Sequence, residues 1–166
     1  MGVRQSDLLF DDFYSVELPK LLAVALGLTG SREVANDVVH ETFLRAYRRW
    51  DRVSLFDSPG GWARRVLINL ATDVHRRSVR EGRALTRIAG ERQTVFGEPD
   101  LDRFWETVRT LPERQRAVVA LRYADDLAVE TIAAVLAISV GAVTKSLFVA
   151  RKTLAAQLQL EMEDGR

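Results

Sequence analysis

The sequence predicts an all-α protein made of two small helical domains joined by a flexible linker. Apolar residues recur at helical spacing in two blocks, roughly residues 6–80 and 101–160. Between the blocks, glycine and proline interrupt a stretch that mixes both charge signs. No segment has the alternation and turn spacing of a sheet protein. We therefore expect domains over residues 1–80 and 101–160, a linker over 81–100 and a polar tail over 161–166.

The first block predicts three helices. Gly30 suits the end of the first helix, and Ser31 suits the N-cap of the second. Pro19 lies inside the first helix, where we expect a kink or a short interruption. The third helix should begin at Ser58 or Pro59, after a glycine- and proline-rich turn.

The second block ends in a helix-turn-helix pattern over residues 127–154. A short break at 137–139 separates two helices whose apolar residues would share a small core, and Ser139 caps the second helix. The first exposed turns of that helix could enter a major groove. The same spacing also suits a hairpin that packs against another protein, so the pattern alone favours DNA binding only by a small margin.

The composition excludes most catalytic and metal-binding chemistry. The chain has no cysteine, and its two histidines, His40 and His75, lack a partner at a metal-ligand spacing. We find no nucleophile motif and no phosphate-binding loop, so we expect no enzyme, no cofactor and no metal. The formal net charge is +1, which means that any nucleic-acid surface must be local.

Hydropathy favours a cytoplasmic protein without membrane insertion. No apolar stretch is long enough to span a bilayer. Asp7, Asp11 and Asp12 interrupt the segment that would have to form the apolar core of a secretory signal.

Motifs in both blocks resemble those of extracytoplasmic-function (group 4) bacterial sigma factors of the actinobacterial kind. Residues 111–154 are similar to sigma region 4, through the strings LPERQR, LRY, IA, SVG and AR. The string NDVVHETFLRAYRRWD resembles region 2.2, and PGGWARRVLINLATDVHRRSVRE resembles regions 2.3 and 2.4. Both blocks occur in the family's order with a linker between them.

The resemblance implies a sigma factor that binds core RNA polymerase, recognises the −35 and −10 promoter elements and promotes DNA melting in transcription initiation. Region 2 would bind the beta-prime clamp, and region 4 would bind the beta flap. Association with the polymerase would place the protein on the nucleoid. An anti-sigma factor is expected as a further partner, in a stress response.

The resemblance assigns polymerase binding to the second helix. Histidine stands at position 40, where the family usually has glutamine. A plainer interpretation of the same helix is a solvated face with ion pairs at i, i+4 spacing. The residues assigned to the polymerase are Asp37, His40, Glu41, Leu44, Arg45 and Arg48.

Contacts to the −10 element are assigned to the third helix and the turn before it. Strand separation needs a pocket for an unstacked base and cations for the exposed backbone. Trp62 lies in the apolar stripe, so a place in the core is favoured over a stacking role. The assigned residues are Phe56, Trp62, Arg64, Arg65, Asn69, Asp73, Arg76 and Arg77.

Contacts to the −35 element are assigned to the last helix, where this chain departs from the family pattern. Ser146 and Val149 replace arginines, Phe148 replaces a histidine, and Ala137 replaces a glycine. The helix therefore either reads an unusual element or covers a protein surface; the first is slightly favoured. The assigned residues are Arg122, Ser139, Ala142, Thr144, Lys145, Ser146, Phe148 and Arg151.

Two other functions fit parts of the pattern. A stand-alone helix-turn-helix regulator would bind a palindromic site as a dimer, but would leave the arginine-rich helices of the first block without a purpose. A sigma-like regulator that binds protein instead of DNA would explain the missing cations of the last helix.

Overall fold

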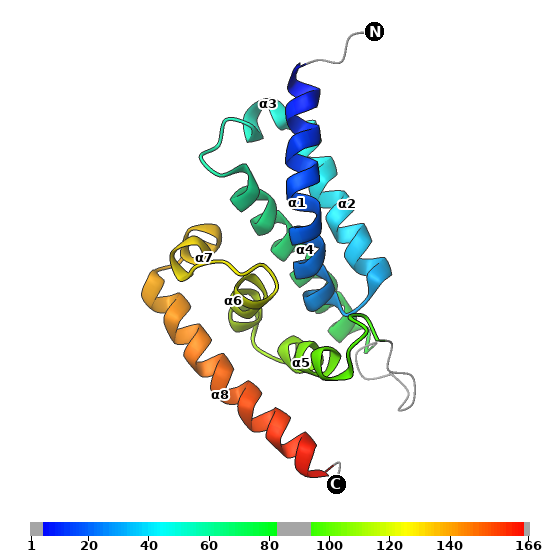
Figure 1. Cartoon of the computed structure of the whole chain (residues 1–166), viewed down its shortest axis with the longest axis vertical. Helices are drawn as coiled ribbons and strands as arrows, with labels where there is room; N and C mark the ends of the chain where they lie inside the picture. Colours follow the sequence, from blue (N-terminus) through cyan, green and yellow to red (C-terminus); the bar gives the residue numbers. More distant parts are fainter. Residues whose placement is uncertain (1–4, 83–93, 165–166) are drawn as a thin grey trace.

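The computed structural model describes residues 5–82 and 94–164, and within them the chain forms eight α-helices and no strand. The all-α prediction is confirmed. The N-terminal bundle comprises α1 (Gln5–Thr29), α2 (Arg32–Arg48), α3 (Trp50–Val53) and α4 (Pro59–Arg80). The C-terminal group comprises α5 (Pro99–Arg109), α6 (Glu113–Tyr123), α7 (Val129–Leu136) and α8 (Val140–Asp164) (Figure 1).

Local signals set the helix boundaries of the N-terminal bundle. Gly30 adopts a left-handed conformation (φ +65°) after α1. The Ser31 hydroxyl accepts a hydrogen bond from the Val34 amide, which satisfies one of the unpaired donors at the start of α2. Ser58 caps α4 in the same way, and Pro59 is its first residue. The expected interruption at Pro19 does not occur, because α1 continues through it.

The C-terminal group is built around α6. Every residue from Ala117 to Leu121 is buried, so this part of the helix is covered on all sides. The axes of α7 and α8 differ by 108°, within the usual range for a helix-turn-helix. Ser139 caps α8 by accepting a hydrogen bond from the Ala142 amide at 3.0 Å. Among the described residues, no single helix is long and apolar enough to cross a membrane; the bent α7–α8 pair meets that test on length and composition alone.

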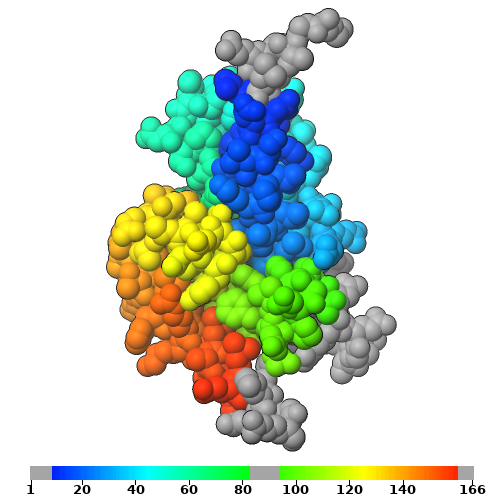
Figure 2. Space-filling view, in the orientation of Figure 1, coloured from blue at the N-terminus to red at the C-terminus, as the bar shows by residue number. Residues whose placement is uncertain are grey.

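The two helical groups pack tightly on each other. Helices α5 and α6 lie against α1, and α7 lies against α4 (Figures 1 and 2). Gly27 permits the close approach, because a Cβ there would lie 2.8 Å from the Trp105 ring. Arg109 donates a hydrogen bond to the Gly27 carbonyl at 3.0 Å. Within the expected linker, residues 83–93 lie outside the described part, whereas Val95 is buried and its carbonyl accepts a hydrogen bond from Arg32.

A buried arginine joins the two groups. Arg64 of α4 is only 6% exposed. Its guanidinium pairs with Glu17 of α1 at 2.8 Å and with Asp125, which follows α6. It also donates a hydrogen bond to the Gly60 carbonyl at 3.0 Å. Because the Asp125 side chain is 2% exposed and that of Glu17 is 13% exposed, both carboxylates depend on Arg64 for charge compensation.

We expect Ala137→Gly to raise the free energy of unfolding by about 1 kcal/mol. Ala137 ends α7 in a left-handed conformation (φ 54°), which glycine adopts without the clash of a Cβ. The matched control is Ala134→Gly, at an exposed position inside α7, which should lower stability by roughly 0.5–1 kcal/mol. Urea unfolding measures both. A loss of stability on Ala137→Gly would contradict the prediction.

Arg64→Met should destabilise the protein by roughly 3 kcal/mol or more, because it leaves Glu17 and Asp125 buried without a cation. Arg65→Met, at the neighbouring exposed position, removes the same charge and should change stability little. Thermal and urea unfolding of the two variants make the comparison. Equal effects would show that Arg64 does not link the helices energetically.

Candidate promoter and polymerase surfaces

The outer face of α2 gathers the residues assigned to the polymerase. The opposite face packs into the bundle through Val38, Val39, Phe43 and three smaller residues. The assigned side chains lie away from it: four are exposed, and Glu41 and Leu44 are half-buried. Glu41 and Arg45 form an ion pair at 2.9 Å, which is the i, i+4 pairing expected of a solvated helix face. We call this face the α2 surface; it comprises Asp37, His40, Glu41, Leu44, Arg45 and Arg48.

An exposed stripe of polar residues runs along α4. Its members recur every three or four positions and therefore share one side of the helix. Arg64 does not belong to it, because its side chain points into the ion-pair network. Arg80 extends the stripe by one turn and was not among the predicted residues, although its spacing from Arg76 could have indicated it. The α4 stripe comprises Arg65, Asn69, Asp73, Arg76, Arg77 and Arg80.

The turn between α3 and α4 exposes apolar side chains. Phe56 is 46% exposed, and its ring centroid lies 6.4 Å from that of Trp62. Leu55 is 82% exposed and was not predicted, although two consecutive apolar residues in a turn are a signal for such a surface. Trp62 is half-buried and packs against the core, in keeping with the favoured core interpretation.

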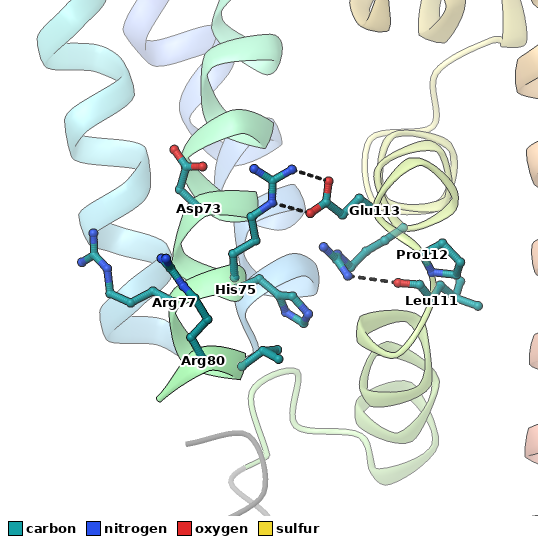
Figure 3. A pocket seen from close by; sticks show the side chains of 10 residues that line it. Asp73, His75, Arg77, Arg80, Leu111, Pro112 and Glu113 are labelled. Atoms are coloured by element: carbon teal, nitrogen blue, oxygen red, sulfur yellow. Dashed lines mark hydrogen bonds and ion pairs between the residues drawn. The ribbon is translucent and has the colours of Figure 1, made fainter. Parts of the chain in front are cut away.

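The α4 stripe lines two clefts between the helical groups. Near the start of α4, Trp62 and Arg65 face Glu130 and Thr131 of α7 across a cavity of about 460 Å³. Near its end, residues of the stripe line a cavity of about 720 Å³ that the start of α6 also borders; Glu113 points toward α4, and Arg77 points away from α6 (Figure 3). In this arrangement the second group lies beside much of the surface assigned to the −10 element, while the residues of the stripe themselves stay exposed.

Ion pairing at the second cleft perturbs its titratable groups. Arg76 donates two hydrogen bonds to Glu113, one of them at 2.7 Å, and these bonds lower the pKa of the Glu113 carboxyl and raise that of Arg76. Burial, followed by the positive charge of Arg116, lowers the pKa of His75. Burial also lowers the pKa of Arg116 itself. The cleft thus holds one paired cation, Arg76, beside a buried one, Arg116.

On α8, most residues assigned to the −35 element share an accessible surface. Thr144 and Lys145 are exposed on its second turn, and Phe148 is 62% exposed on the next. Ser146 is 8% exposed and packs inward, so it does not share that surface. Its place on the buried side follows from its position next to Leu147, one turn after Val143.

The remaining cations near α8 are held by neighbouring side chains. Arg151 donates a hydrogen bond to the Tyr123 hydroxyl at 2.7 Å. Arg122 pairs with Asp126 at 3.0 Å. The Lys152 ammonium, which was not predicted, lies 5.3 Å from the centre of the Phe148 ring. Together these groups make a mixed aromatic and cationic surface that can contact a phosphate backbone or a base.

The two helical groups match two sigma-factor domains. Residues 13–81 match the family model of Sigma-70 region 2, and residues 101–154 match that of Sigma-70, region 4. These matches place α4 in region 2 and the helix-turn-helix of α7 and α8 in region 4.

Relatives from two bacterial genera are similar over most of the chain. The RNA polymerase sigma-E factor of Streptomyces antibioticus is 27% identical over 159 residues, which cover 95% of this chain and 88% of the relative. The ECF RNA polymerase sigma-E factor of Escherichia coli K12 is 27% identical over 139 residues, 74% of this chain and 73% of the relative.

Two solved structures have a similar fold. RpoE of Bartonella quintana, in complex with the anti-sigma factor NepR, has a TM-score of 0.69 at 23% identity and covers 90% of this chain and 96% of its own. CnrH, in complex with the cytosolic domain of CnrY, has a TM-score of 0.68 at 25% identity, with 91% and 88% covered. With regions 2 and 4 matched in order and relatives aligned across the linker, the chain belongs to the extracytoplasmic-function sigma factors of bacterial RNA polymerase.

Proposed function

The chain is a sigma factor for transcription initiation, and we propose which surfaces carry that function. The α2 surface binds the beta-prime clamp of core polymerase. The α4 stripe and the turn before it bind and help to melt the −10 element. The exposed side of α8 binds the −35 element, and region 4 also binds the beta flap. The observation that carries this proposal is that the three sets of residues lie on helix faces of the matched regions 2 and 4.

We further propose that regions 2 and 4 must separate before the −10 element can bind. The α4 stripe lines both clefts between the regions, and Arg76 is already paired with Glu113 of region 4. Arg64 could contact DNA only if it left Glu17 and Asp125. Binding of core polymerase would supply the free energy for this opening, because only the open state could engage the clamp and the flap at their separate positions.

An anti-sigma factor is a proposed partner, since both similar solved structures are complexes, one of them with a protein so described. A cytoplasmic location, on the nucleoid through the polymerase, follows from the same function. The apolar exposure of Phe148 and of Val149, at 62% and 37%, favours protein binding by α8 as the second candidate function.

The double variant Asp37→Arg, Glu41→Arg should weaken binding to core polymerase at least about tenfold, because like charges then meet at the clamp. The double variant Asp12→Arg, Asp100→Arg changes the net charge equally at exposed sites outside the α2 surface and should bind as the wild type does. Core binding is measured by fluorescence anisotropy, followed by promoter-specific transcription. Core binding without initiation by the wild type would favour the protein-binding regulator, and no core binding would contradict the proposal.

Gly27→Ala should open the protein without changing its charge, because the new Cβ would lie 2.8 Å from the Trp105 ring at the interface of α1 and α5. We expect a larger radius of gyration by small-angle X-ray scattering and a severalfold higher affinity for short random-sequence single-stranded DNA. The control is Gly141→Ala in α8, where the nearest atom is 3.9 Å away. If Gly27→Ala expands the protein but leaves DNA affinity unchanged, closure does not restrict the α4 stripe.

A further inference from the structure

The cleft between the end of α4 and the start of α6 collects cations from both regions. Arg76, Arg77 and Arg80 come from region 2, and Arg116 comes from region 4. Two carboxylates, of Asp73 and Glu113, also line the cavity. Among the described residues that line the cavity, four arginines against two carboxylates leave an excess of two positive charges when His75 is neutral. Figure 3 shows His75 and Glu113 projecting into the space between the two helices.

Arg116 is the strongest sign that this cleft receives a ligand. Its side chain is only 4% exposed, and its Nη1 donates a hydrogen bond to the Leu111 carbonyl at 3.0 Å. Its Nη2 is also buried, and no group in residues 5–82 or 94–164 accepts a hydrogen bond from it. A buried guanidinium with an unsatisfied donor costs free energy, and native proteins rarely retain one without a use for it. An anion in the cleft would compensate the positive charge of the buried Arg116 guanidinium.

We propose that this cleft binds a small phosphorylated anion, which it holds between regions 2 and 4. An excess of two positive charges matches a phosphate dianion, and arginine is the side chain whose donors best fit phosphate oxygens. The volume of about 720 Å³ is that of a small-molecule site. A DNA duplex does not fit such a space, so the proposed ligand differs from promoter DNA, although the cleft shares Asp73, Arg76, Arg77 and Arg80 with the α4 stripe.

His75 supplies a reporter inside the cleft. Burial and the nearby Arg116 lower its pKa in the free protein. A bound dianion would offset the positive charge of Arg116 and raise that pKa. His40 is the other histidine of the chain and lies on the α2 surface, outside the cleft, so its ring resonance is an internal control.

The experiment follows both histidine ring resonances by NMR in the full chain, without polymerase or DNA, while inorganic phosphate is added at constant ionic strength. We expect a saturable shift and a raised pKa at His75, no phosphate effect at His40, and neither effect with chloride. Because neither polymerase nor DNA is present, a lack of phosphate binding would leave the proposed promoter function untouched. A second titration uses a nucleoside diphosphate: tighter binding than phosphate would identify a nucleotide as the ligand, and equal or weaker binding would identify free phosphate.

Two variants test the assignment of the site. Arg80→Ala removes an exposed cation of the cleft and should weaken phosphate binding at least about tenfold. Arg52→Ala, on the exposed surface of α3, removes the same charge elsewhere and should not. Arg116→Gln should abolish binding, and if that variant does not fold, the Arg80 result decides. The proposal would be overturned if chloride shifted the His75 resonance as phosphate does, or if Arg80→Ala and Arg52→Ala bound phosphate equally well. An acidic peptide that moved His75 where phosphate did not would also overturn it and would mark the cleft as a protein-docking surface.

Discussion

The arrangement of the two regions depends on the burial of Arg64. Its guanidinium, carried by α4, pairs with one carboxylate from α1 and with another from the segment after α6, so three elements of the fold meet at this side chain. Glu17 and Asp125 could not remain buried and ionised without it. The close contact of Gly27 with Trp105 adds shape complementarity near the end of α1. Region 4 is therefore fixed on region 2 by both charge and packing.

A buried ion pair holds an interface in a defined position without making it very stable. The cost of removing three charged groups from water offsets much of their mutual attraction, so the closed state gains orientation more than free energy. When the regions separate, Arg64, Glu17 and Asp125 regain water, which limits the cost of opening. Arg76 and Glu113 are exposed and lose still less. Such an interface suits a protein whose two regions pack together in the free state and separate when it binds the polymerase.

The sequence predicted the long helices, but it missed the short α3, wrongly suggested an interruption at Pro19, and did not show which way individual side chains point. Ser31, Ser58 and Ser139 marked helix starts because capping depends on residues within one turn. The sequence could not distinguish buried Arg64 from exposed Arg65 and Arg76. The two carboxylates that pair with Arg64 lie 47 and 61 residues away along the chain. The contact between the regions could not be predicted for the same reason: it rests on pairs that no local pattern contains. The family resemblance supplied the functions of both regions, which the residues alone left open.

If α8 reads the −35 element as proposed, its composition would make promoter recognition by region 4 dependent on region 2. The accessible surface of α8 offers few cations, and Arg151 and Arg122 also bond to Tyr123 and Asp126. Each phosphate contact that is missing reduces affinity and flattens its dependence on salt. A weakly cationic recognition helix can still select DNA if it is held beside the duplex, because tethering replaces affinity by effective concentration. Polymerase docked on the α2 surface would provide that tether, so specificity would rest on Thr144, Lys145 and Phe148 and occupancy on the polymerase.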